Sequence, residues 1–252
     1  MGRYGMNPVP VAARRVALVL VVVTTLLAPS LTTLWVSTPS GTDVQARVSA
    51  LTNHYGIVLL GPQDIPSMLA KAVVATEDER FYTHHGIDSV GLARAFLYDV
   101  SNRCLCQGGS TITEQLVKDV YLGGYNSGYD KMVDAVLALK VERVLTKPQI
   151  MADYLSEITT GLGRRGVSTA SCAYFQAPLH NLSLGQYALL AGVTQAPSLY
   201  DPTVDPAAAV HRRSQVLASM ISEGFITAAE ALEANAEPVL VTGGHPDPAC
   251  AP

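Results

Sequence analysis

Charged residues are scarce in this sequence of 252 residues, since only 15% are Asp, Glu, Lys or Arg. Nearly half of the residues are hydrophobic, and this composition excludes an intrinsically disordered chain. A basic excess is also missing, because the formal net charge is −4; the balance gives no support for nucleic acid as a partner. The sequence contains no Gly-rich phosphate loop and no internal repeat, which argues against nucleotide-binding and solenoid folds.

Long hydrophobic runs are absent beyond residue 36, but one precedes it. Val16–Val36 carries no charged residue, and as a helix it would span roughly 31 Å, one hydrocarbon core. Arg3, Arg14 and Arg15 precede the run and the first acidic residue is Asp43, so the positive-inside rule places the N-terminus in the cytoplasm. A cleaved signal peptide is the alternative, but its apolar region is usually about 7–15 residues long. The length favours a retained anchor.

These observations predict a cytoplasmic segment over residues 1–15, a transmembrane anchor over 16–36, one extracytoplasmic domain over 37–236 and a loose, Pro/Gly-rich tail over 237–252. Outside the membrane, the four cysteines permit two disulfides, whose connectivity stays open. A direct Cys104–Cys106 bridge would close a small, strained ring. Cys250 lies in the tail and is a candidate for a free thiol. The C-x-C spacing does not favour zinc, and no metal site is predicted from the cysteines.

Hydrophobic periodicity and capping signals predict a mainly helical fold. Ser183 with Gln186 and Thr227 with Glu230 fit the capping-box pattern S/T-x-x-E/Q. Only Gly56–Leu60 and Pro238–Val241 are typical of strands. The expected helices cover residues 66–76, 89–100, 111–120, 130–145, 148–157, 167–175, 184–194, 206–223 and 227–235.

Three clusters of polar residues could carry chemistry. Acids and histidines gather in residues 77–86, where a solvated helix end is the alternative. Two glycines and three hydroxyls lie in residues 108–115 at a helix start, where anions are favoured; an ordinary N-cap loop is the alternative. Lys118 forms the third cluster with Lys131 and Asp134, which share a helix face. A surface ion pair worth less than about 1 kcal/mol is the alternative there.

In this order and spacing, the motifs resemble the peptidoglycan glycosyltransferases (glycosyltransferase family 51), which comprise the transglycosylase domains of class A penicillin-binding proteins and the monofunctional enzymes. The family pattern E-D-x-x-F-x-x-H-x-G is matched in full by Glu77, Asp78, Phe81, His84 and Gly86. The pattern G-x-S-T-I-T-Q-Q is matched from Gly108 to Gln115 with one change, Glu114. The resemblance extends from about Ile65 to Leu232.

The resemblance implies a lysozyme-like α-helical domain, with a large head lobe and a small membrane-proximal jaw lobe, behind one N-terminal transmembrane helix. It implies polymerisation of lipid II into glycan strands with inversion, releasing undecaprenyl pyrophosphate. The expected partners are lipid II, the nascent glycan strand, the bacterial cytoplasmic membrane and other cell-wall synthesis proteins. Because the sequence stops at Pro252, a monofunctional enzyme is expected.

The resemblance also implies roles for individual residues. Glu77, Lys131 and Asp134 form the catalytic set: Glu77 is the general base, and Asp134 orients Lys131 or binds a cation. The substrate-binding set consists of Lys118, Ser110, Thr111, Gln115, Asp78 and His84. Within it, Lys118 holds the pyrophosphate together with Lys131 and with donors from Ser110, Thr111 and Gln115. His84 is expected to buttress its loop. A divalent cation, Mg²⁺ or Mn²⁺, can assist at the pyrophosphate, as in some relatives.

Several residues depart from the family pattern. Where the family has R-K-x-x-E, this chain has Asp130, Lys131 and Asp134, so an acid replaces an Arg at a pyrophosphate site. Glu114 replaces a Gln and adds negative charge, and Ser156 stands where the family usually has Asn. These departures leave open a catalytically degenerate relative that binds lipid II or a cell-wall partner. A lysozyme-like glycan hydrolase is a third possibility, because a shared fold does not fix function.

Overall fold

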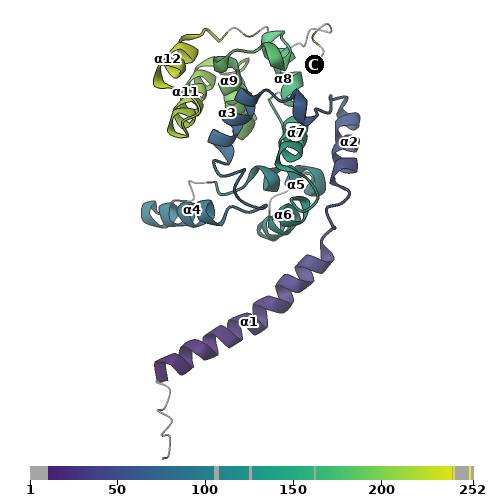
Figure 1. Ribbon diagram of the computed structural model, residues 1–252, viewed down its shortest axis with the longest axis vertical. Coiled ribbons are helices and arrows are strands. Elements are labelled where there is room, and N and C mark those ends of the chain that lie inside the picture. Colours follow the sequence, from purple (N-terminus) through teal and green to yellow (C-terminus); the bar gives the residue numbers. More distant parts are fainter. Residues whose placement is uncertain are drawn as a thin grey trace, which may run out of the picture. The chain divides into compact units, whose positions relative to one another are not determined.

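The computed structural model describes residues 11–104, 108–124, 127–161 and 163–239, together with Val241 and Cys250. The chain divides into two compact units, one ending at Pro39 and the other beginning at Ser40. Within the described residues the structure is helical, with two isolated β-bridges and no strand, so the predicted mainly helical fold is confirmed (Figure 1). The helices are α1 (Val11–Ser37), α2 (Val44–Tyr55), η1 (Pro62–Asp64), α3 (Ser67–Glu77), α4 (Ser89–Asn102), α5 (Ile112–Leu122), α6 (Gly128–Val141), α7 (Lys147–Glu157), α8 (Val167–Phe175), η2 (Leu179–Asn181), α9 (Leu184–Gln195), α10 (Pro197–Tyr200), α11 (Pro206–Ser222) and α12 (Ala228–Ala236).

The first unit contains the single helix α1, which includes the predicted anchor and continues through Pro29. Thr25 and Thr32 donate their hydroxyls to the carbonyls of Val22 and Ala28, at 3.0 and 2.8 Å, so these polar groups are satisfied within the helix. Among the residues that the structure describes, no helix combines the length and apolarity of a membrane span. The anchor therefore stays a prediction, and residues 1–10 of the expected cytoplasmic segment lie outside the described part.

The second unit is built from two groups of helices (Figure 1). In one, α3, α9 and α11 pack against one another, and α12 joins α9 and α11; in the other, α5 packs between α6 and α7, with α2 against α5 and α7. Their shared core consists of large, fully buried side chains, among them Leu69, Phe81, Ile112, Leu116, Leu137, Ile150, Tyr154 and Tyr174. The predicted division into head and jaw lobes stays a prediction, because this unit forms a single compact body.

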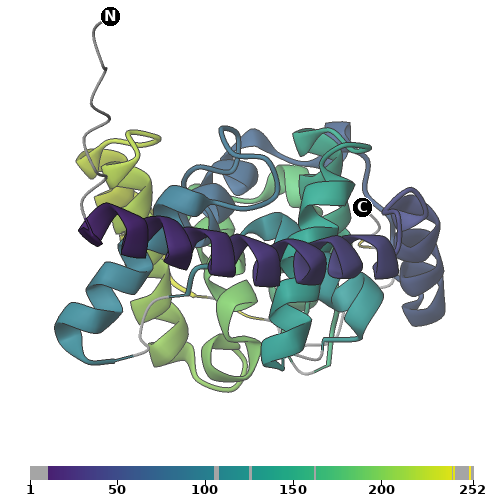
Figure 2. The ribbon, with the colours of Figure 1, turned by 90° about the horizontal axis from the view of Figure 1, so that it is seen from below.

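Helix α4 lies at the edge of the second unit in both views (Figures 1 and 2). Its start is fixed by Asp88, which accepts a hydrogen bond from the Gly91 amide and bonds the Arg80 guanidinium. Ala95 is the helix's buried residue. The apolar side chains that remain exposed are Val90, Leu92, Phe96, Leu97, Tyr98 and Val100. An apolar face of this size on a soluble surface indicates a binding surface.

The capping signals proved the most informative part of the sequence. Ser183 and Thr227 cap α9 and α12 with reciprocal hydrogen bonds to Gln186 and Glu230, as predicted.

Helix α2 was not predicted. The predicted strand over Gly56–Leu60 is wrong, because no extended segment among the residues that the structure describes pairs with it. The Leu60 amide instead donates to Ser156 Oγ at 2.9 Å. The predicted strand over 238–241 includes Leu240, which lies outside the described residues.

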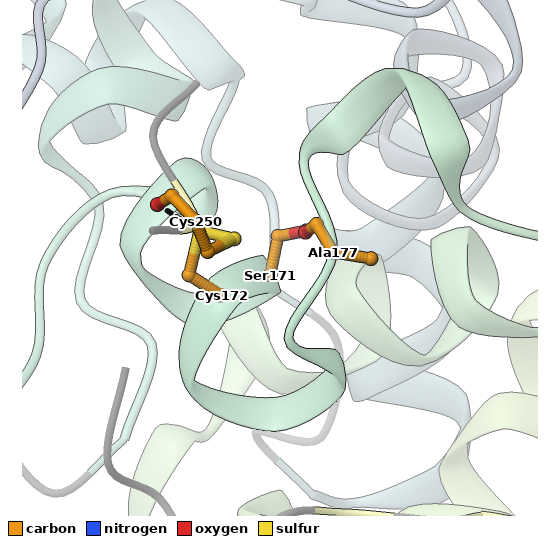
Figure 3. The surroundings of a disulfide bond; sticks show 4 residues. All are labelled: Ser171, Cys172, Ala177 and Cys250. Atoms are coloured by element: carbon orange, nitrogen blue, oxygen red, sulfur yellow. Dashed lines mark hydrogen bonds between the residues drawn. A yellow bond between two sulfur atoms is a disulfide. The ribbon is translucent and has the colours of Figure 1, made fainter. Parts of the chain in front are cut away.

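A disulfide joins Cys172 in α8 to Cys250 across 78 residues of sequence (Figure 3). The expectation that Cys250 is free is therefore wrong. The bridge ties the end of the chain to α8, where the neighbouring Ser171 donates its hydroxyl to the Ala177 carbonyl. Cys104 is also disulfide-bonded, whereas Cys106 and most of the predicted tail lie outside the described residues.

Gly86 provides a test of how the segment after α3 packs on α6. Its φ is +87°, and a Cβ atom there would lie 2.7 Å from the backbone of Ala138. At Gly56 the φ is +63°, but no atom lies within 4 Å of the position that a Cβ atom would take. We expect Gly56→Ala to cost about 1–2 kcal/mol of unfolding free energy from left-handed backbone strain alone, and Gly86→Ala to cost clearly more. Urea unfolding of both variants measures this, and equal losses would contradict the packing.

Candidate active site

Two adjoining hollows lie where the end of α3 meets the start of α5. The larger, of about 300 Å³, is lined by Glu77, Asp78, Glu79, Arg94, Ser110 and Thr111, among others. The smaller, of about 30 Å³, is lined by Ser110, Glu114, Gln115, Lys118, Lys131 and Asp134. Ser110 borders both, and Gln115 of the smaller hollow bonds to Glu77 of the larger one. The structure thus brings the predicted base and the predicted cationic residues to one groove.

Glu77 is the last residue of α3, and its two carboxylate oxygens have different surroundings. Oε2 accepts a hydrogen bond from Gln115 Nε2 at 2.9 Å, whereas Oε1 is buried and has no hydrogen-bond partner among the described residues. Burial raises the pKa of the Glu77 carboxyl, and the charge of Asp78 adds to the rise. The Gln115 hydrogen bond and the charges of Arg212 and Lys118 oppose it.

Asp78 and His84 are turned toward each other. His84 Nε2 lies 2.9 Å from Asp78 Oδ2, and the same oxygen accepts the backbone amide of Ile112 at 3.1 Å. The side chains of Asp78 and His84 are 1% and 7% exposed. Buttressing of the loop by His84 agrees with this placement; contact of either side chain with substrate stays a prediction.

Thr111 begins α5 in a capping box with Glu114. The Thr111 amide donates to Glu114 Oε2 at 2.8 Å, and the Glu114 amide donates to Thr111 Oγ1 at 3.1 Å. The Thr111 hydroxyl itself donates to the Gly86 carbonyl at 2.7 Å. Thr111 therefore joins the segment of residues 77–86 to the segment of residues 108–115. Glu114, which replaces the family Gln, completes the cap of α5.

Lys131 of α6 reaches across to the start of α5. Its Nζ donates to Ser110 Oγ at 2.6 Å and lies 3.4 Å from Glu114 Oε1. Because the Lys131 side chain is 41% exposed, it can also meet a ligand from the groove. Lys118 extends from α5 into the same hollow. Two ammonium groups and a hydroxyl thus border one small space, the donor set that a phosphate group requires.

The acidic departures in α6 take different positions. Asp130 is exposed and caps the helix, since its Oδ2 accepts the Ser127 amide at 2.8 Å. Asp134 is buried, and its Oδ1 has no hydrogen-bond partner within the described part of the chain. Burial raises the pKa of Asp134 to about 6, against the opposing charge of Lys131. The side chain of Asp130 is thus engaged with the helix end, whereas Asp134 adds a buried acid to the hollow.

Ser156, the remaining departure, has a structural contact. It is fully buried, donates to the Ala152 carbonyl at 2.7 Å and accepts the Leu60 amide at 2.9 Å. It fixes the extended segment before η1 against α7. This replacement for the family Asn lies away from the hydrogen bonds of the groove.

With this geometry in place, a family model described as "Transglycosylase" matches residues 46–221. The chain belongs to the transglycosylase family. The match includes α3 to α11, and with them all the predicted site residues. The second unit accordingly contains a domain of the transglycosylase family.

Individual relatives agree with the family model. Penicillin-binding protein 1A from Vibrio cholerae is 39% identical over 71% of this chain and 22% of its own length. The proteins of that name from Streptococcus pneumoniae and Escherichia coli are 42% and 40% identical over 66% and 65% of this chain, and 23% and 19% of their own. The chain thus spans less than a quarter of these relatives. A crystal structure of penicillin-binding protein 1A from Haemophilus influenzae aligns over 74% of this chain and 18% of its own, with 22% identity and a TM-score of 0.45.

Two residues next to Glu77 were missed by sequence reasoning. One is Arg212 of α11, whose Nε and Nη2 are buried without a hydrogen-bond partner in the described residues. Its charge lowers the pKa of Glu77. The available signal was an Arg at helical spacing between the buried residues Ala209 and Val216. Tyr154 of α7 donates to Gln115 Oε1 at 3.2 Å. No local pattern indicates this contact, because the two residues lie 39 positions apart.

Asp134 makes stability depend on pH in a defined direction. Since its folded pKa is raised to about 6, the folded protein holds a proton that the unfolded chain has released, and its contribution to stability falls as pH rises from about 4 to 6. We expect the unfolding free energy of Asp134→Asn, relative to the original protein, to increase over that range. Urea unfolding from pH 4 to 7.5 measures it.

Asp130→Asn is the matched control for this measurement. Hydrogen bonds from Ser127 hold the pKa of Asp130 below its usual range, so this variant should lose relative stability as pH rises through the acidic range. The unfolding free energy of each variant, minus that of the original protein, is therefore expected to change with pH in opposite directions for Asp134→Asn and Asp130→Asn. If the unfolding free energy of Asp134→Asn, relative to the original protein, falls as pH rises, the Asp134 carboxylate is stabilised as an anion.

Proposed function

We propose that this chain is a peptidoglycan glycosyltransferase that polymerises lipid II, undecaprenyl-pyrophosphoryl-MurNAc-(pentapeptide)-GlcNAc. The observation that carries the proposal is the placement of Glu77: its Oε2 accepts a hydrogen bond from Gln115, and Gln115 borders a hollow together with Lys118 and Lys131. A base and a cationic phosphate site are the two groups that sugar transfer from a pyrophosphate donor requires. The monofunctional organisation expected from the sequence remains a prediction.

In this reaction the GlcNAc 4-hydroxyl of the acceptor attacks the anomeric carbon of the donor MurNAc. The new C–O bond forms as the hydroxyl proton passes to Glu77. The anomeric C–O bond to the pyrophosphate breaks at the same time, and undecaprenyl pyrophosphate leaves with the bonding electrons, so configuration inverts. Lys131, Lys118 and Ser110 stabilise the charge that develops on the leaving group. Thr111, Asp78 and His84 hold the two motifs that frame the groove.

The mutational test of the base is Glu77→Gln, which keeps the shape of the side chain and removes its basicity. We expect polymerisation of labelled lipid II to be lost, by about 10²-fold or more, while binding of lipid II is largely retained. Glu223→Gln, a carboxylate at the end of α11, serves as the control and should keep full turnover. Turnover by Glu77→Gln would refute the assignment of the base.

We also propose that a divalent cation accompanies the pyrophosphate. Glu114 and Asp134 border the small hollow, and Mg²⁺ is commonly held by one or two carboxylates together with substrate phosphates. Within the described residues no group of three or more potential ligands is assembled, so the phosphate oxygens would complete the coordination. When bound, the cation supplies positive charge at the leaving group.

Chelation tests the cation. We expect EDTA to lower the rate of polymerisation and added Mg²⁺ or Mn²⁺ to restore it. Asp134→Asn should raise the Mg²⁺ concentration needed for half of the maximal rate, whereas Asp130→Asn, at the exposed cap, should not. A rate that EDTA leaves unchanged would exclude the cation.

The proposed location is the bacterial cytoplasmic membrane, with a single span at 16–36 and the catalytic domain outside. Support comes from the three arginines before the run, and from the Cys172–Cys250 disulfide, which is typical of an oxidising compartment. The exposed apolar face of α4 suits contact with lipid, where the substrate's polyprenyl chain is held. Other cell-wall synthesis proteins remain expected partners.

One observation favours the alternative of a catalytically degenerate relative. Glu114 replaces a family Gln in the small hollow, and Asp130 replaces a family Arg, so less positive charge faces a departing pyrophosphate than in the family pattern. Absence of glycan chains with both Mg²⁺ and Mn²⁺ present, together with retained lipid II binding, would establish that alternative. Release of fragments from preformed peptidoglycan would instead indicate a hydrolase.

A further inference from the structure

The amide group of Gln115 makes one hydrogen bond at each end. Its nitrogen donates to Glu77 Oε2 at 2.9 Å, and its oxygen accepts the phenolic hydroxyl of Tyr154 at 3.2 Å. The two ends of an amide have nearly the same shape, so the hydrogen bonds decide which end faces Glu77. A reversed amide would present its oxygen to a carboxylate oxygen, which is repulsive.

Tyr154 is suited to fix this orientation. Its side chain is fully buried in α7, a helix that packs against α5, so the hydroxyl has little freedom to move. Burial, and next the charge of Glu77, hold the pKa of Tyr154 well above its usual range. The phenol therefore keeps its proton, and donates to Gln115, throughout the pH range in which the enzyme can work.

Fixing the amide distinguishes the two oxygens of the base. Oε2 is engaged by Gln115, and Oε1 is left buried without a hydrogen-bond partner among the described residues. The Gln115 bond thus holds the carboxylate in one orientation and favours its anion, the form that accepts a proton.

We propose that Tyr154 is a positioning residue, which holds the Gln115 amide so that its nitrogen faces Glu77 Oε2 and favours the anion that accepts the proton of the attacking hydroxyl. This rests on the proposed glycosyltransfer. In that step the acceptor O–H bond breaks with its proton going to the Glu77 carboxylate, while the sugar C–O bond forms and the bond to the pyrophosphate breaks. Gln115, expected from the sequence to bind the leaving group, acts on the base instead.

The charged groups around Glu77 come from several elements. Asp78 follows it in the same turn, Lys118 reaches it from α5 and Arg212 from α11. Tyr154 and Gln115 add no charge, so removing the phenolic hydroxyl leaves these charges in place. If removing that hydroxyl changes the pKa of Glu77, the change therefore comes from the loss of the hydrogen bonds that link Tyr154, Gln115 and Glu77.

The test compares Tyr154→Phe with Tyr174→Phe in the full chain. Both tyrosines are fully buried, and the hydroxyl of Tyr174 bonds to Thr160 and Asp201 instead of the groove. We expect Tyr154→Phe to lower kcat about tenfold, as loss of one hydrogen bond in the transition state would, with little change in KM. The acidic limb of its kcat/KM profile should move to higher pH, because Glu77 loses the bond that favours its anion. Tyr174→Phe should leave that limb in place.

Gln115→Leu provides a second variant, which removes the amide directly. Because Tyr154 and Gln115 act through the same series of hydrogen bonds, the double variant Tyr154→Phe/Gln115→Leu should shift the acidic limb no further than Gln115→Leu alone. Additive shifts, or an unmoved limb in Tyr154→Phe, would overturn the proposal. If Tyr154→Phe unfolds while Tyr174→Phe does not, an unmoved limb in Gln115→Leu would still overturn it.

A readout without turnover separates this inference from the proposed function. In protein labelled with ¹³C at the glutamate carboxyl carbons, Glu77→Gln identifies the resonance of Glu77. Its titration midpoint should rise in Tyr154→Phe and stay in place in Tyr174→Phe, even if the protein polymerises no lipid II. A midpoint equal in all three proteins would exclude Tyr154 from the role.

Discussion

The buried carboxylate of Asp78 joins the two segments on which the groove depends. It accepts the backbone amide of Ile112 at the start of α5 and bonds the ring of His84. Its position directly after Glu77 places the end of α3 beside the first turn of α5. Thr111 adds a second connection through the Gly86 carbonyl. Together with the hydrogen bond from Gln115 to Glu77, these contacts fix the separation between the base and the residues of α5.

The charged side chains of the groove differ in how far they are exposed. Lys131 is half-exposed and can reach a ligand, whereas Glu114 is buried and engaged in its helix cap. Asp130, which the sequence suggests would repel a pyrophosphate, is exposed and engaged in a cap of its own. Asp134 keeps the acidic character of the family Glu, and its buried carboxyl has an oxygen without a hydrogen-bond partner, among the described residues, in the hollow that the lysines border. A charge reversal read from a motif carries little information until the direction of the side chain is known.

The sequence predicted most helices because periodicity and capping are local properties. The boundaries of α8 agree, and the caps of α9 and α12 are as expected. Helix α2 could have been found from Val44, Val48 and Thr52, which recur every four residues and are buried. The strand over 56–60 failed because an extended segment needs a partner, and Ser156 supplies a single hydrogen bond in its place. Local pattern cannot supply the contacts of Tyr154 and Arg212 with the groove, which arise from the packing of α7 and α11.

The surroundings of Glu77 suggest how one carboxyl can both take a proton and release it. Burial favours the protonated form and raises the pKa of Glu77, while Gln115, Arg212 and Lys118 favour the anion and oppose that rise. In the proposed reaction, a pyrophosphate at Lys118 and Lys131 cancels part of the positive charge and raises the proton affinity of Glu77 when the hydroxyl must be deprotonated. Departure of the pyrophosphate restores that charge and lowers the affinity again. The leaving group would thus regulate the base through the lysines that bind it, and the proton would be released after the product has left.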